Sequence, residues 1–401
     1  MPEVSRRGMQ MPASPIRKLV PLCNEAEKRG VKVYKLNIGQ PDIPSPPEAF
    51  EALRKVDRTV LEYSPSEGLL SLRRKLAGYY HGFGIDVDTD DIIITSGGSE
   101  AVLFAFMSCL NPGDEIIVPE PAYANYMAFA ISAGARIVPV PSSIENGFAL
   151  PAVEEIEKRI TPRTRGILIC NPNNPTGYLY TEAELLSIRD IVKKYDLYLF
   201  SDEVYREFCY SGAPYISAMT LPGIERQVVL IDSVSKRYSE CGIRIGALVT
   251  RSAELRKTVM KFCMARLSPP LLGQLVAEAS IDASAEYMLR NYNEYLERRN
   301  FLVDGINRIP GCFSPIPMGA FYTVASLPVD NADRFCEWCL KEFEYEGATV
   351  FMAPASGFYS DPERGRNEVR IAYVLCKEAL AKALKVLAEA LKAYPGRTSE
   401  C

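Results

Sequence analysis

The 401-residue sequence contains one histidine, His81, and no long apolar run. A single histidine excludes zinc sites built from several histidines, and its polar surroundings disfavour a Ser-His-Asp triad. No segment approaches the ~20 apolar residues that cross a bilayer, and residues 1–30 lack the apolar core of a signal peptide. The net charge of -4 comes without a basic cluster. We therefore expect a cytoplasmic protein without nucleic-acid or membrane partners.

The eleven cysteines do not form a disulfide framework, because their number is odd and their spacing irregular. In a chain without an export signal, such cysteines are typically reduced thiols, many of them in the core. Cys336 and Cys339 match the pattern C-x-x-C, but Phe335, Trp338, Cys339 and Phe343 fall on one helical face. This favours a buried helix over zinc or redox chemistry, and we predict no metal site.

Short apolar runs alternate with segments of helical periodicity. The predicted strands are Ile92–Thr95, Glu115–Val118, Arg136–Val140, Gly166–Cys170, Leu197–Ser201, Val228–Asp232 and Ile245–Thr250. The helices between them include Ser99–Leu110, Tyr123–Ala133 and Glu182–Tyr195. This alternation predicts an α/β fold with a mostly parallel sheet between two layers of helices, a three-layer αβα domain. Ligands of such sheets bind beyond the carboxyl ends of the strands.

The pattern changes at about residue 285, where a long helix leads into a mixture of short strands and helices. This predicts a second, smaller α+β domain. We place the large domain at residues 46–287, and the small domain at residues 1–45 together with 288–401. The proline-rich stretch PDIPSPPEAF marks the junction near residue 45.

Chemically useful side chains follow several predicted strands. SGGSEA, with Gly98 and Ser99, places backbone N–H groups at a helix start, which is typical of an anion site. It lacks the glycine spacing and lysine of a nucleotide loop. NPNNPTG contains Asn174 and is also explained by a rigid turn.

SDEVY places Asp202 at the end of a strand and Tyr205 beyond it, although Asp202 would equally suit a helix N-cap. DSVSK brings Ser233, Ser235 and Lys236 to the end of the next strand. An acid, a lysine and a phosphate site without histidine or metal fit pyridoxal phosphate chemistry. The lysine forms a Schiff base, the acid keeps the pyridine nitrogen protonated, and the turn binds phosphate.

At this point the sequence resembles the class I aminotransferases of the fold-type I pyridoxal-phosphate enzymes, a group that includes bacterial aspartate aminotransferases. The resemblance extends from about Leu36 to Leu391. The motifs that support it are LNIGQPD, YSPSEGLLSLR, TSGGSEA, NPNNPTG, SDEVY, SVSK with GIRIG, GAFY and EVRIAY.

The resemblance implies roles for residues around the ring of pyridoxal 5'-phosphate. Lys236 is the expected Schiff-base lysine, and after substrate displaces it, the base and acid that moves the proton. Asp202 is expected to pair with the pyridinium nitrogen. Asn174 and Tyr205 are expected to hydrogen-bond the phenolate oxygen, and Tyr123 to stack on the ring.

The resemblance also implies a phosphate site and a shared dimer. The expected phosphate ligands are Gly98, Ser99, Ser233, Ser235 and Arg244. Tyr63 resembles the tyrosine that reaches the phosphate of the neighbouring subunit, which implies a homodimer with shared active sites.

For the substrate, the resemblance implies that Arg370 binds the α-carboxylate, assisted by the Gly39 N–H and by Asn174. Arg266 precedes a Pro-Pro segment like the region from which some relatives supply a cation for a distal carboxylate. Arg266 could equally well be a surface arginine that ends the preceding helix. The sequence departs from the family pattern at Glu240 and Cys241. A carboxylate at 240 would pair with Arg237 or alter the mouth of the site.

We therefore expect an aminotransferase that moves an amino group from an L-amino acid to a 2-oxo acid by a ping-pong mechanism. Aspartate and 2-oxoglutarate are the favoured pair. A cysteine-type C–S β-lyase would use the same machinery and release pyruvate and ammonia. A non-catalytic ligand-sensing protein is the third alternative. Such sensors join the fold to an N-terminal DNA-binding domain, for which we expect no room before Leu36.

Overall fold

Seven strands form one central sheet in the computed structural model, which describes residues 2–398. In spatial order they are β2 (Ile92–Thr95), β8 (Gly246–Val249), β7 (Val228–Ser233), β6 (Tyr198–Asp202), β5 (Thr164–Cys170), β3 (Glu115–Glu120) and β4 (Arg136–Pro141). Only β8 runs antiparallel to its neighbours. The predicted α/β class with a mostly parallel sheet is confirmed.

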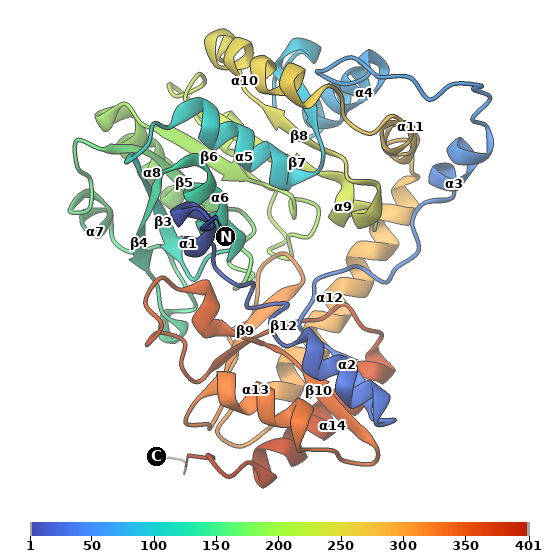
Figure 1. Ribbon diagram of the computed structural model, residues 1–401, viewed down its shortest axis with the longest axis vertical. Helices are drawn as coiled ribbons and strands as arrows, with labels where there is room; N and C mark the ends of the chain where they lie inside the picture. Colours follow the sequence, from blue (N-terminus) through green and yellow to red (C-terminus); the bar gives the residue numbers. More distant parts are fainter. Residues whose placement is uncertain (1, 399–401) are drawn as a thin grey trace.

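Side chains of successive strand residues enter two different cores, because they point to opposite faces of the sheet. Leu168 and Phe200 pack in one core, whereas Ile167 and Leu199 pack in the other. Helices cover both faces (Figure 1). The helices of this part of the chain are α3 (Pro47–Arg54), α4 (Leu70–His81), α5 (Gly98–Cys109), α6 (Asn125–Ala133), α7 (Val153–Glu157), α8 (Glu182–Tyr195), α10 (Ala253–Arg266) and α11 (Leu271–Ser280).

The smaller lobe joins segments from both ends of the chain, as Figure 1 shows. β1 (Lys32–Lys35) pairs in parallel with β10 (Ala348–Phe351). β9 (Tyr322–Ser326), β12 (Glu368–Ala372) and β11 (Ala353–Pro354) form an antiparallel sheet. The helices here are α2 (Val20–Lys28), α12 (Ala285–Asn307), α13 (Ala332–Lys341) and α14 (Lys377–Ala393). The short helix α1 (Arg6–Gln10) lies instead against α6 of the large lobe (Figure 1). The division at residues 46 and 287 stays a prediction.

Two boundaries differ from the sequence prediction in a way that affects the site. β6 ends at Asp202 and β7 at Ser233, so both residues belong to strands rather than following them. The N-cap interpretation of Asp202 is wrong, because a turn and not a helix follows β6.

Cys336 and Cys339 are free and buried in α13, as predicted. Within residues 2–398, no helix has the length and apolar character needed to cross a membrane.

Candidate active site

The carboxyl ends of three neighbouring strands carry the polar residues of the site. Asn174 lies in the loop after β5, Asp202 ends β6, and Ser233 ends β7. Because β5, β6 and β7 are adjacent and parallel, their ends meet at one edge of the sheet. Lys236 follows on the short helix α9 (Val234–Arg237). The topology thus brings together Asn174 and Lys236, which are 62 positions apart in the sequence.

A pocket of about 680 Å³ opens at this edge and is lined by residues of both lobes. Every predicted site residue lines it except Tyr63 and Arg266. Those that line it are Gly39, Gly98, Ser99, Tyr123, Asn174, Asp202, Tyr205, Ser233, Ser235, Lys236, Arg244 and Arg370.

Asp202 lies buried at the base of the site, with 7% of its surface exposed. Its Oδ2 accepts a hydrogen bond of 2.6 Å from the Tyr126 hydroxyl. Burial raises the pKa of Asp202 to about 6, and the hydrogen bond from Tyr126 opposes the rise. Within the described residues, this neutral phenol is its only side-chain donor. Asp202 can therefore accept a cationic N–H such as that of a pyridinium ring.

The amine of Lys236 extends into the pocket toward the N-terminal segment. Its Nζ donates to the Gly39 carbonyl at 2.8 Å and lies 3.8 Å from Cys241 Sγ. The Phe321 ring centroid is 5.9 Å from Nζ. Within residues 2–398 no carboxylate holds the amine in place, so it can move toward a ligand.

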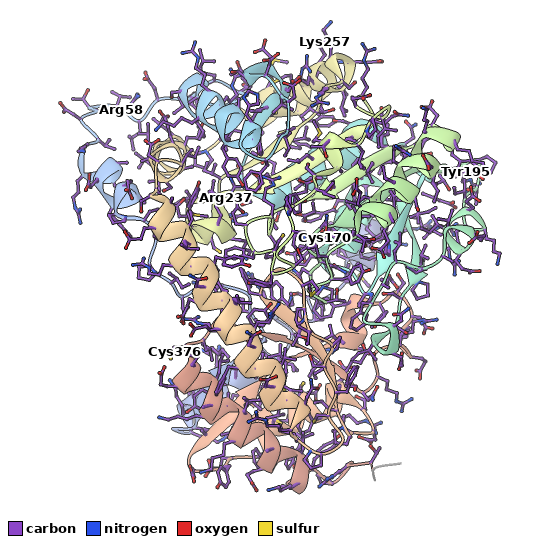
Figure 2. All side chains as sticks on the ribbon, turned by 180° about the vertical axis from the view of Figure 1, so that it is seen from behind. Arg58, Cys170, Tyr195, Arg237, Lys257 and Cys376 are labelled. Carbon is purple, nitrogen blue, oxygen red and sulfur yellow. The ribbon has the colours of Figure 1, made fainter. Side chains whose placement is uncertain are left out.

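A buried charge network fixes the helix that presents Lys236. The Arg237 guanidinium pairs with Asp232 and, at 3.3 Å, with Glu207. Arg206 reaches the same Asp232 carboxylate at 3.1 Å. Figure 2 shows Arg237 in the interior of the molecule. Because removal of one partner from a buried ion pair costs about 3–5 kcal/mol, this network anchors α9 firmly to β7.

The expected pairing of Glu240 with Arg237 is wrong. Arg237 is already engaged by Asp232 and Glu207. Glu240 instead accepts a hydrogen bond from the Ser280 hydroxyl, which connects the loop after α9 to α11. Burial raises the pKa of Glu240 to about 7. Glu240 does not line the pocket, so its role is in packing this loop.

Anion-binding groups converge beside Lys236. Gly97 has φ of +81°, and a Cβ on it would lie 2.3 Å from Arg244 Nη2, so glycine allows this arginine to approach the start of α5. The hydroxyls of Ser233 and Ser235 lie 2.8 Å apart, and Ser99 is in the first turn of α5. Helix N–H groups, hydroxyls and a guanidinium are suitable ligands for phosphate.

Arg370 is the most unusual group of the pocket, because it is a buried cation without a carboxylate partner among residues 2–398. Its side chain is 1% exposed; Nη1 donates to Asn174 Oδ1 at 3.1 Å and Nη2 to the Asn37 carbonyl. Nε is buried and has no hydrogen-bond acceptor within the described residues. Burial lowers the pKa of Arg370. A buried, uncompensated guanidinium favours the binding of an anion.

Four tyrosines line the pocket. The rings of Tyr123 and Tyr126 meet edge to face at 5.3 Å. The Tyr205 and Tyr322 hydroxyls lie 3.1 Å apart, and the Tyr322 ring lies 4.6 Å from the Arg370 guanidinium. The Tyr322 hydroxyl also approaches Gly39 so closely that a Cβ there would collide with it. These contacts connect the two lobes across the pocket.

The sequence prediction missed several residues of the site. Tyr322 belongs to GAFY, which supported the resemblance without a role being assigned. Tyr126 follows Tyr123 by three positions, a spacing that places both on one helical face. Asn37 belongs to LNIGQPD, which also supported the resemblance without a role for this residue, whereas no motif contains Arg17.

Tyr63 and Arg266 lie outside the pocket of their own chain. Tyr63 is 77% exposed. Arg266 pairs with Glu100 at 3.1 Å and donates to the Ser66 carbonyl at 2.9 Å. Arg266 therefore does not reach the pocket of its own chain.

The site as a whole fits the cofactor implied by the resemblance. The fit rests on three features of residues 2–398: a buried acid without a cationic partner there, an amine without a carboxylate partner there, and an anion cradle that a Cβ at residue 97 would fill. These groups correspond to the pyridine nitrogen, the aldehyde and the phosphate of pyridoxal phosphate.

Comparisons with known proteins point the same way. The family model described as "Aminotransferase class I and II" matches residues 31–387. An aspartate aminotransferase of Pyrococcus horikoshii is 32% identical over 404 residues, which cover 97% of each chain. An aromatic-amino-acid aminotransferase of Thermococcus litoralis is 32% identical, covering 94% of this chain and 96% of that protein.

Among solved structures, the aspartate aminotransferase of Thermus thermophilus with maleate superposes with a TM-score of 0.88. It is 28% identical and covers 97% of this chain and 100% of its own.

Asp202→Asn in the cofactor-free protein tests the cost of burying this carboxylate. The folded-state pKa of about 6 lies above the ordinary 3.8, so between these values the folded state holds a proton that the unfolded state has released. The wild type should therefore lose stability relative to the variant as pH rises from about 4 to 7, by up to about 3 kcal/mol. Urea unfolding across this range measures the difference, and a difference independent of pH would contradict the assignment.

Proposed function

Because the chain belongs to the class I and II aminotransferases, we propose that it transfers the amino group of L-aspartate to 2-oxoglutarate by a ping-pong mechanism. The single observation that carries the substrate class is Arg370, a buried guanidinium whose only partners among the described residues are neutral oxygens. Amino acids and 2-oxo acids share a carboxylate next to the reacting carbon. One arginine can therefore bind both substrates in turn.

Pyridoxal phosphate, the cofactor of this family, supplies an electron sink that stabilises negative charge at the substrate α-carbon. Asp202 would hold the proton on the pyridine nitrogen, and its burial strengthens that interaction. The phosphate would be held by Ser99, Ser233 and Arg244, with Ser235 supporting Ser233 through the hydroxyl contact.

Lys236 would transfer protons during the reaction. Its Nζ would take the proton from the substrate α-carbon and hold it for return during the reaction. Its partners are the Gly39 carbonyl and Cys241 Sγ, and no carboxylate among the described residues restrains the amine.

Arg370 and Asn174 would orient the substrate. The contact of 3.1 Å from Arg370 Nη1 to Asn174 Oδ1 links the arginine to the loop that is expected to contact the ring oxygen, together with Tyr205. Tyr123 would cover the ring from the opposite side. Orientation of the α-carbon bond relative to the ring follows from fixing both ends of the substrate.

We also propose a cytoplasmic homodimer in which Tyr63 completes the neighbouring site. The segment from α3 to residue 63 exposes Phe50, Val60, Leu61 and Tyr63, each more than half exposed. Figure 2 shows that Arg58, in the same segment, lies at the periphery of the molecule. Such a cluster of exposed apolar residues supports a protein interface. The ten cysteines among the described residues are free thiols, in keeping with a reducing compartment.

Replacement of Lys236 tests the chemical role of its amine. Lys236→Ala should reduce turnover of aspartate with 2-oxoglutarate by at least about 1,000-fold, because nucleophile and proton carrier are both lost. Lys236→Arg, which keeps the charge but cannot deprotonate, should be equally inactive. Steady-state kinetics on folded, cofactor-saturated variants measures this. Activity within tenfold of the wild type in either variant would contradict the proposal.

Tyr63→Phe tests the shared site. Loss of one phosphate hydrogen bond should weaken cofactor binding about 5- to 10-fold without unfolding the chain, because Tyr63 is exposed within its own subunit. Fluorescence titration of the cofactor-free protein measures this affinity, with sedimentation velocity to report the dimer. Tyr195→Phe, on the surface at the far side from Arg58 in Figure 2, is the control and should leave affinity unchanged. A monomer, or equal affinities in both variants, would refute the shared site.

A further inference from the structure

The pocket contains more positive charge than the two recognised anions need. Its lining includes the cations Arg17, Lys236, Arg244 and Arg370, against the single carboxylate Asp202. Under the proposed function, Arg244 serves the cofactor phosphate, Arg370 the α-carboxylate, and Lys236 the reacting centre. Arg17 is left without an anion.

Arg17 is also free of protein partners among residues 2–398. Its backbone N–H donates to the Ser14 carbonyl at 3.1 Å and closes a turn, but its exposed guanidinium forms no ion pair or side-chain hydrogen bond there. The positive charge of Arg17 acts on the phenol of Tyr123, lowering a pKa that burial raises. Arg17 and Tyr123 both line the pocket.

The turn that carries Arg17 is fixed relative to Arg370. Asn37 donates through Nδ2 to the Ile16 carbonyl at 2.9 Å, while its own carbonyl accepts from Arg370 Nη2. Pro15 packs so tightly on Gly357 that a Cβ there would lie 2.3 Å from the Pro15 ring. One asparagine therefore connects the backbone of the turn that carries Arg17 to the Arg370 guanidinium.

Neighbouring cations do not compete for this role. Lys18, the next residue, pairs with Asp333 of α13 and does not line the pocket. Arg266 is engaged by Glu100. Among the cations that line the pocket, only Arg17 has neither a protein partner among the described residues nor an assigned anion.

We propose that Arg17 binds the distal carboxylate of dicarboxylic substrates while Arg370 binds the α-carboxylate, so that the N-terminal turn of the same chain selects the side chain. This proposal rests on the proposed function. A dicarboxylic amino acid and its 2-oxo partner both satisfy the two arginines.

The exposure of Arg17 limits how strict this selection is. When a neutral substrate binds, the exposed Arg17 guanidinium stays in contact with water, so no buried charge is left without a partner. Discrimination against neutral amino acids should therefore amount to about 10- to 100-fold, the contribution of one charged contact, and not to the 10⁴-fold that a fully desolvated site can reach.

The experiment compares Arg17→Gln with Lys18→Gln in the holoenzyme. Arg17→Gln should lower kcat/KM for aspartate and glutamate about 10- to 100-fold and change that for alanine less than about 3-fold. Lys18→Gln removes a charge one residue away and should change all three less than about 2-fold. Calorimetric binding of maleate and butyrate gives the same comparison without turnover. Arg17→Gln should weaken binding of maleate only.

Equal losses for aspartate and alanine, or no loss for aspartate, would overturn the assignment of Arg17. A selective loss of dicarboxylic substrates in Arg266→Ala, but not in Arg17→Gln, would overturn it in favour of a partner-supplied cation. If the wild type binds maleate through Arg17 but transfers no amino group, the proposed function fails and the Arg17 site stands. The two failures are thus distinguishable.

Discussion

The site depends on one constraint, which is that adjacent parallel strands end at the same edge of a sheet. β5, β6 and β7 are buried on both faces, so their side chains serve packing, and chemistry is left to the residues at their ends. Asn174, Asp202 and Lys236 are distant in sequence but share this edge. The charge network of Arg206, Asp232 and Arg237 extends the constraint by one helical turn, from the end of β7 to Lys236.

A second constraint is the balance of charge. The pocket holds four cations and one carboxylate, and its most buried cation, Arg370, has only neutral acceptors among the described residues. Burial of such a group is costly, and an anionic ligand relieves the cost. A cofactor phosphate, an α-carboxylate and a distal carboxylate supply that compensation. Anionic ligands would therefore balance the excess positive charge of the pocket.

Much of the site was predictable because strand ends can be recognised from apolar runs followed by polar clusters. This is how Asp202, Ser233 and Lys236 were identified, within one residue of the true strand ends. Residues positioned by contacts between distant segments were not predictable. Arg17 reaches the pocket through Asn37 and the packing of its turn, and Arg266 is turned away by Glu100. Such contacts leave no periodicity in the sequence.

The most direct test of the account follows the visible absorption of the purified, cofactor-bound protein through the two halves of the reaction. Addition of aspartate alone should remove the visible band of the bound cofactor in stoichiometric amounts, and 2-oxoglutarate should restore it and release glutamate. This result requires one pocket to bind an amino acid and a 2-oxo acid in turn, as Arg370 predicts. A band that never converts, with pyruvate and ammonia released from cysteine-type substrates, would contradict transamination and indicate a β-lyase.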